Sequence, residues 1–130
     1  MERTSNKINW FEIPVTDMVR ARGFYEAIFE IELSPMPFNT KDSIEMFVFP
    51  NDPATGKTGG ALLKEANYEP RDNGVVLYLN ANPSIQDVLD RIERAGGTIL
   101  KPRTQIAPEI GYMALFLDSE GNRIALHASD

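Results

Sequence analysis

The sequence predicts an α+β fold built from two tandem βαβββ modules. Two observations predict it. The same order of elements, a strand, an amphipathic helix and three further strands, occurs twice along the 130 residues. The apolar positions of the two occurrences also share one phase. We therefore expect a single domain, residues 1–130, with module one at 8–66 and module two at 74–128.

Module one begins at 8–14, where loosely alternating apolar residues indicate a strand. Thr16 and Asp17 are candidate N-caps for a helix from Met18 to Glu30, in which apolar residues recur every three or four positions. Alternation and flanking turn residues predict three more strands, at 31–33, 44–49 and 59–64.

Module two follows a polar linker at 67–73. The nearly continuous apolar run at 75–80 predicts a strand buried on both faces. A second helix is expected to begin near Ser84 and to end at Gly96, because glycine commonly terminates helices. The remaining elements are a strand at 98–100, a loop at 101–110 expected to cover the cavity mouth, and a hairpin of strands 111–118 and 123–128 joined by a turn at 119–122.

The two modules can be aligned by counting. A shift of 65 positions places Trp10 on Val75 and Gly56 on Gly121, and a shift of 64 brings the apolar helix positions together. Few residues are identical, but element order and apolar phase agree, which favours an internal duplication. The alternative is that two similar units arose by chance within an α+β domain.

Composition excludes several classes of protein. The net charge is −6, and the 13 basic residues are scattered among 19 acidic ones, which argues against a nucleic-acid partner. The absence of cysteine excludes disulfides and thiolate chemistry. The first residues carry no apolar segment typical of a signal peptide, and no run has membrane-spanning length. We expect a cytoplasmic protein with no membrane partner.

Two stretches of the chain resemble a known family. Residues 8–25, INWFEIPVTDMVRARGFY, resemble the opening strand and helix of the glyoxalase/bleomycin-resistance/extradiol-dioxygenase superfamily, also called vicinal oxygen chelate proteins. Residues 117–127, LDSEGNRIALH, are similar to its closing hairpin, and residues 59–63 and 95–97 fit as well. The resemblance implies a glyoxalase-like fold, in which the two modules form a curved, half-barrel mixed sheet around a cavity. It leaves function open, because the superfamily includes metalloenzymes and antibiotic binders.

The resemblance also implies where metal ligands would stand. The four corners of the family's metal site correspond here to Trp10, Gly60, Val75 and Ala125. An indole N–H only donates, and the other three side chains offer no lone pair to a metal. The chain has a single histidine, whereas the family site uses two. We therefore expect no metal and no cofactor.

Other side chains would face the same cavity. If Trp10 and Ala125 point inward, strand alternation directs Glu12 and His127 inward as well. Glu12 and His127 are the candidate catalytic acid and base; a solvent-edge carboxylate and a half-exposed strand histidine are the structural alternatives. Trp10 would be a platform for a planar ligand or a core residue. The expected ligand-binding residues are Trp10, Met46, Phe49, Val75, Leu77, Tyr112 and Ala125.

Three functions remain open at this point. The first is a metal-independent binding protein for an aromatic or apolar small molecule, and the resemblance implies a homodimer with its sites between protomers. The second is a lyase, isomerase or dioxygenase-type enzyme that uses Glu12 and His127, or a metal site placed elsewhere. The third is a scaffold protein whose cup is filled by its own side chains, such as Trp10 and Phe49.

Overall fold

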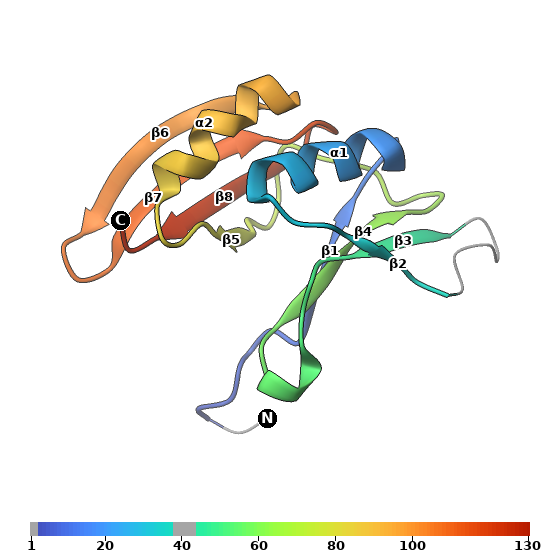
Figure 1. The fold of residues 1–130 in the computed structure, drawn as a ribbon, viewed down its shortest axis with the longest axis horizontal. Coiled ribbons are helices and arrows are strands. Elements are labelled where there is room, and N and C mark those ends of the chain that lie inside the picture. Colours follow the sequence, from blue (N-terminus) through green and yellow to red (C-terminus); the bar gives the residue numbers. More distant parts are fainter. Residues whose placement is uncertain (1–2, 38–43) are drawn as a thin grey trace.

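The structure, a computed structural model, describes residues 3–37 and 44–130 (Figure 1). Module one contains β1 (Trp10–Pro14), α1 (Met18–Phe29), β2 (Ser34–Pro35), β3 (Glu45–Val48), a 3₁₀ turn (Pro53–Thr55) and β4 (Gly59–Lys64). Module two contains β5 (Tyr78–Asn80), α2 (Ile85–Ala95), β6 (Thr98–Ala107), β7 (Gly111–Leu117) and β8 (Arg123–Ala128). The predicted order, two βαβββ units, is confirmed.

The two modules share one sheet topology. The strand order is β1-β4-β3-β2 in module one and β5-β8-β7-β6 in module two. In each sheet the first strand pairs in parallel with the last, and the other pairs are antiparallel. The same mixed topology in both halves supports the duplication, and the two sheets do not close into a barrel.

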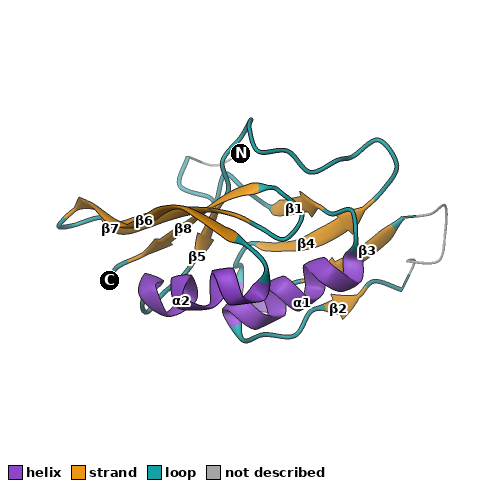
Figure 2. Ribbon diagram, turned by 90° about the horizontal axis from the view of Figure 1, so that it is seen from above, coloured by secondary structure: helices purple, strands orange, loops and turns teal. Residues whose placement is uncertain are grey.

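Both helices cover the same side of the sheets and pack against each other (Figures 1 and 2). Asp17 begins α1 by accepting a hydrogen bond from the backbone N–H of Arg20 at 3.0 Å. The core lies between the helices and the sheets. It includes Phe24, Tyr25 and Ile28 of α1, Ile85 and Ile92 of α2, and Leu62, Phe116 and Leu126 of the sheets. Neither helix in the described part of the chain is long and apolar enough to cross a membrane.

The predicted strand at 98–100 and loop at 101–110 are wrong, because β6 continues to Ala107. Its pairing with β7 is interrupted by three register shifts, the second between Lys101 and Thr104, which accommodates Pro102. An edge strand tolerates proline, since one side of its backbone forms no ladder. Most of the segment expected to cover the cavity mouth is therefore part of a sheet.

The predicted strand at 75–80, buried on both faces, is also wrong. Only Tyr78–Asn80 form β5, and Leu79 alone of these three is buried. Val75, in the bend before β5, is 98% exposed, and Tyr78, whose neighbour Leu79 points into the core, is 53% exposed. The chain just before β5 still runs beside β8, because the Ala125 backbone N–H donates a hydrogen bond to the Leu77 carbonyl at 2.9 Å.

In module one, the short strand expected at 31–33 lies at Ser34–Pro35 instead. Leu33 belongs to the core, and its backbone N–H donates to the Glu26 carboxylate at 2.9 Å. The residue that was expected within a strand therefore anchors the connection after α1.

Candidate functional site

A groove of about 680 Å³ lies where the two modules meet. One wall is β1 with the residues just before it, and the other is the segment leading into β5 together with the start of β8. Its lining combines four exposed apolar or aromatic side chains, Trp10, Tyr68, Val75 and Tyr78, with the half-buried Leu77. The charged lining residues are Glu12, Glu69, Arg71 and Arg123. A concave site with many apolar and few polar groups is typical of small-molecule binding.

Alternation along β1 explains the first wall. Phe11 and Ile13 point toward the helices and the core, so Trp10 and Glu12 point away from it. The indole N–H of Trp10 donates to a Glu12 carboxylate oxygen at 3.2 Å. Gly59, the partner of Trp10 in β4, leaves room for the ring, since an added Cβ would lie 3.3 Å from it. Trp10 remains 43% exposed, which leaves its ring accessible.

The linker between the modules supplies part of the opposite wall. The Tyr68 hydroxyl donates to the backbone carbonyl of Glu12 at 3.3 Å, tying the linker to β1. Partial burial, and then the charges of Glu12 and Glu65, raise the pKa of Tyr68 above its usual value. Tyr68 therefore stays a neutral hydrogen-bond donor at physiological pH.

The turn between β7 and β8 joins the modules at one end of the groove. Asp118 is 4% exposed, and its carboxylate accepts a hydrogen bond from the Tyr25 hydroxyl at 2.6 Å. It also accepts hydrogen bonds from the backbone N–H and the side-chain amide of Asn122. Burial raises the pKa of Asp118, and these hydrogen bonds offset part of that effect. For Tyr25, burial and the Asp118 charge raise the pKa well above its usual value.

Glu120, in the same turn, holds the start of α1. One carboxylate oxygen accepts hydrogen bonds from the backbone N–H groups of Thr16 and Asp17, each at 2.8 Å. The other accepts a hydrogen bond from Arg20 Nε at 2.7 Å. Burial alone would raise the pKa of Glu120, but these hydrogen bonds outweigh it and lower the pKa. The hydrogen bond to Glu120 and then the charge of Glu120 raise the pKa of Arg20. A carboxylate at a helix N-terminus is stabilised by the exposed N–H groups there.

Asn122 connects this turn to both sides of the groove. Its side-chain amide donates to the carbonyl of Pro14, the last residue of β1, at 2.7 Å. Its side-chain oxygen accepts the backbone N–H of Arg71, in the linker, at 3.1 Å. The turn of module two therefore fixes the spacing between β1 and the linker.

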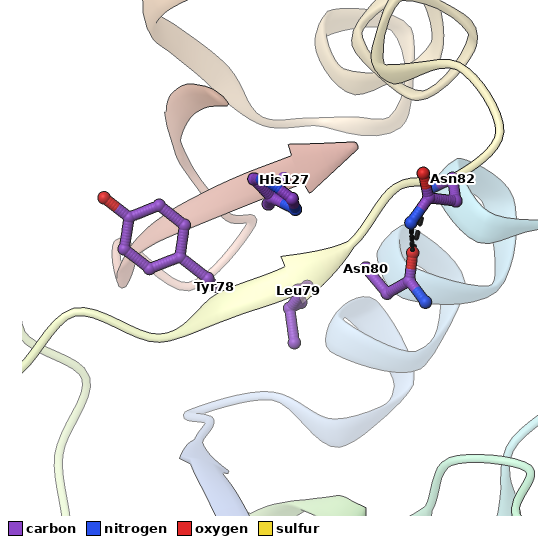
Figure 3. A pocket seen from close by; sticks show the side chains of 5 residues that line it. All are labelled: Tyr78, Leu79, Asn80, Asn82 and His127. Carbon is purple, nitrogen blue, oxygen red and sulfur yellow. Dashed lines mark hydrogen bonds between the residues drawn. The ribbon is translucent and has the colours of Figure 1, made fainter. Parts of the chain in front are cut away.

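Four of the side chains predicted from sequence line this groove: Trp10, Glu12, Val75 and Leu77. His127 lines a second hollow of about 380 Å³ with Tyr78, Asn80 and Asn82 (Figure 3). His127 Nε2 lies 2.8 Å from the Ile110 carbonyl, which only accepts, so Nε2 carries the hydrogen in this contact. Glu12 and His127 thus line different hollows and do not form one acid–base pair.

The other predicted residues lie outside the lining of the groove. Phe49 packs on the helix side, with ring centroids 5.6 Å from Phe11 and 5.7 Å from Tyr25. Tyr112 lies under the Arg103 guanidinium at 3.6 Å. Met46 pairs with Leu63, and Ala125 is fully buried. Phe49 and Tyr112 were expected to face the cavity, but their side chains lie on the other face of the sheet and pack against the core.

Sequence reasoning missed Tyr68, Arg71, Tyr78 and Arg123 as groove residues. Tyr68 and Arg71 lie in a segment whose polarity indicated only a linker. Tyr78 was hidden in a run interpreted as buried on both faces. An aromatic residue in a polar linker, as at Tyr68, is the signal that could have indicated a surface site.

The residues at the expected metal corners do not fit a metal. Trp10 and Val75 line the groove, Ala125 is buried, and the Phe11 ring occupies the space beside Gly60, where an added Cβ would overlap it. Within residues 3–37 and 44–130, no three carboxylate or imidazole side chains gather closely enough to hold an ion.

A family model described as the Glyoxalase/Bleomycin resistance protein/Dioxygenase superfamily matches residues 7–126. The chain belongs to this superfamily. The match spans both modules, so the resemblance seen in the first strand and the last hairpin extends over nearly the whole chain. A search of curated proteins found no match.

Solved structures of this superfamily share the fold at low sequence identity. TnmS3, an antibiotic binding protein from Streptomyces sp. CB03234, is 20% identical with a TM-score of 0.66, over 99% of this chain and 100% of that one. A family enzyme from Burkholderia phytofirmans PsJN is 16% identical, TM-score 0.67, over 94% and 98%. Glyoxalase I from Zea mays is 15% identical, TM-score 0.67, over 92% of this chain and 43% of that one.

Proposed function

We propose that this superfamily member is a metal-independent small-molecule binding protein whose groove takes an aromatic or apolar ligand. The observation that carries the proposal is the groove of about 680 Å³ in which Trp10, Val75 and Tyr78 stay exposed beside a complete core. Apolar surface that remains uncovered in a concave site commonly marks a binding site.

The chemistry of the site favours binding over catalysis. Acid–base catalysis by Glu12 and His127 would require both groups to reach one substrate, and they line different hollows. The corners of the family's metal site carry no metal-binding side chains, which supports metal independence. The similarity in fold to an antibiotic binding protein is consistent with a binding role.

We also propose that the protein is a cytoplasmic homodimer. Trp10, Val75 and Tyr78 are exposed on the side of the molecule that carries the groove, and a second copy over this side would enclose the groove. Sedimentation equilibrium at micromolar concentration should give twice the mass of the 14.6 kDa chain. A monomer under these conditions would contradict this part of the proposal only.

Ligand titration tests the binding proposal. Trp10 is the single tryptophan, so its emission reports on the groove directly. Planar probes the size of naphthalene should quench or shift this emission with saturation. Val75→Glu should weaken binding about tenfold, because a charge at the rim opposes an apolar ligand. Val19→Glu, at an 81% exposed position of α1 away from the groove, is the matched control and should leave the affinity unchanged.

Two results would count against the proposal. If no planar probe changes the Trp10 emission while circular dichroism shows a folded protein, the groove is not a binding site. Stoichiometric zinc, nickel, manganese or iron in the purified protein would overturn metal independence and would favour the alternative, a lyase, isomerase or dioxygenase-type enzyme.

A further inference from the structure

Arg123 is the first residue of β8 and lines the groove together with Trp10. Ile124 and Leu126 of the same strand pack into the core beneath the helices. Alternation therefore places Arg123 on the opposite face, the one that forms the groove. The side chain is partly buried in a site that is otherwise mostly apolar.

The guanidinium of Arg123 has no hydrogen bond or ion pair with any side chain or carbonyl of residues 3–37 and 44–130. The other arginine of the groove is different. Arg71 donates to the Pro70 carbonyl at 3.1 Å and pairs with Glu69 at 3.0 Å. An arginine has five N–H donors and no acceptor, so a partly buried guanidinium without a protein partner is poised to bind an anion.

We infer that the groove selects planar aromatic molecules that carry an anionic group, such as a carboxylate or sulfonate. The aromatic part lies against Trp10, and the anion binds the Arg123 guanidinium in the bidentate geometry that arginine favours. This inference rests on the proposed binding function and names the chemical class of its ligand.

Glu12 lies in the same groove and would favour a cation instead. Its carboxylate is exposed and already accepts the indole N–H of Trp10 at 3.2 Å. Solvent screens an exposed charge more strongly than a partly buried one. The Arg123 guanidinium therefore decides the charge of the preferred ligand.

Three ligands with the same ring and different charge test the inference: 2-naphthoate, 2-naphthamide and 2-naphthylmethylammonium. Trp10 emission of the wild-type protein should show 2-naphthoate binding about tenfold more tightly than the amide, a difference of about 1.4 kcal/mol. The ammonium should bind most weakly. The preference for the anion should shrink as salt rises from 20 to 500 mM, while amide binding stays constant.

Arg123→Gln should remove the preference for 2-naphthoate and leave 2-naphthamide affinity unchanged. Arg94→Gln is the matched control, because it removes an exposed arginine in the last turn of α2, outside the groove, and it should keep the preference. Equal binding of anion and amide by the wild type, tighter binding of the ammonium, or an unchanged preference in Arg123→Gln would each overturn the inference and leave the binding proposal standing. Failure of all three ligands to bind would overturn both.

Discussion

The turn between β7 and β8 and the groove beside it use polar side chains in opposite ways. In the turn, Asp118 and Glu120 are surrounded by hydrogen-bond donors from α1 and from the turn itself. In the groove, the aromatic rings are exposed and the Arg123 guanidinium has no partner in the described part of the chain. Asn122 belongs to both regions.

This difference separates residues that hold the fold from residues available to a ligand. Buried polar groups that are fully hydrogen-bonded resist change, because each broken bond leaves a desolvated group behind. Exposed apolar surface and an unpaired guanidinium add little to stability, so a ligand can engage them at little cost. Substitutions in the turn should therefore change the free energy of unfolding, and substitutions in the groove should change ligand affinity.

The largest effect is expected for Asp118→Ala. It removes the acceptor of the Tyr25 hydroxyl and of the Asn122 and Glu120 backbone N–H groups. It also removes one of the two acceptors of the Asn122 side-chain amide. We expect a loss of about 3 kcal/mol in the free energy of unfolding, measured by urea denaturation. Asp72→Ala, at an exposed linker position, should change it by less than about 0.5 kcal/mol. A loss below about 1 kcal/mol for Asp118→Ala would show that the turn does not stabilise the modules.

The second effect concerns Glu120→Gln, which keeps the shape of the side chain and removes its charge. We expect a loss of about 1.5 kcal/mol at pH 7, because the charge-assisted bonds to Arg20 and to the start of α1 weaken. Glu69→Gln, which removes an exposed ion pair with Arg71, is the control and should have little effect.

The cost of Glu120→Gln should depend on pH in one direction. The pKa of Glu120 is lower in the folded protein than its ordinary value of 4.5, so its charge stabilises the fold above that value. This contribution disappears as the pH falls below 4.5 and through the folded-state pKa. The raised pKa of Asp118 changes the free energy of unfolding with pH in the opposite direction. Asp118 is present in both the wild type and Glu120→Gln, so its effect cancels when the two proteins are compared. If the difference in free energy of unfolding between the wild type and Glu120→Gln stays constant from pH 7 to pH 3, the role assigned to Glu120 is contradicted.

A third effect, smaller again, compares one tyrosine from each region. Tyr25→Phe removes one of the donors to Asp118 and should cost about 1 kcal/mol in urea denaturation. Tyr78→Phe, in the groove, should leave stability unchanged, since that ring is half exposed at a sheet edge. Equal losses of unfolding free energy in the two variants would show that the turn and the groove contribute alike to stability.

Sequence patterns predict the fold better than they predict the groove. The helices and most strands follow from apolar phase, which depends on neighbours along the chain. The predicted strand at 98–100 is shorter than β6, because the edge position and the register shifts that let β6 accommodate Pro102 cannot be predicted from local sequence. Alternation placed Trp10 and Glu12 on one face correctly. The unpaired state of Arg123 could not be predicted, because it depends on which distant side chains fail to reach it.

The smallest change in stability is expected for Trp10→Phe. The indole–Glu12 hydrogen bond is exposed and the ring borders solvent, so the free energy of unfolding should change by less than about 0.5 kcal/mol in circular dichroism. Calorimetry should nevertheless show binding of 2-naphthamide weakened about fivefold, since the smaller ring offers less surface for stacking. A loss of more than about 1 kcal/mol in stability, with unchanged affinity, would mean that Trp10 belongs to the packed part of the fold. Such a result would place this wall of the groove, like the turn, among the regions that stabilise the fold.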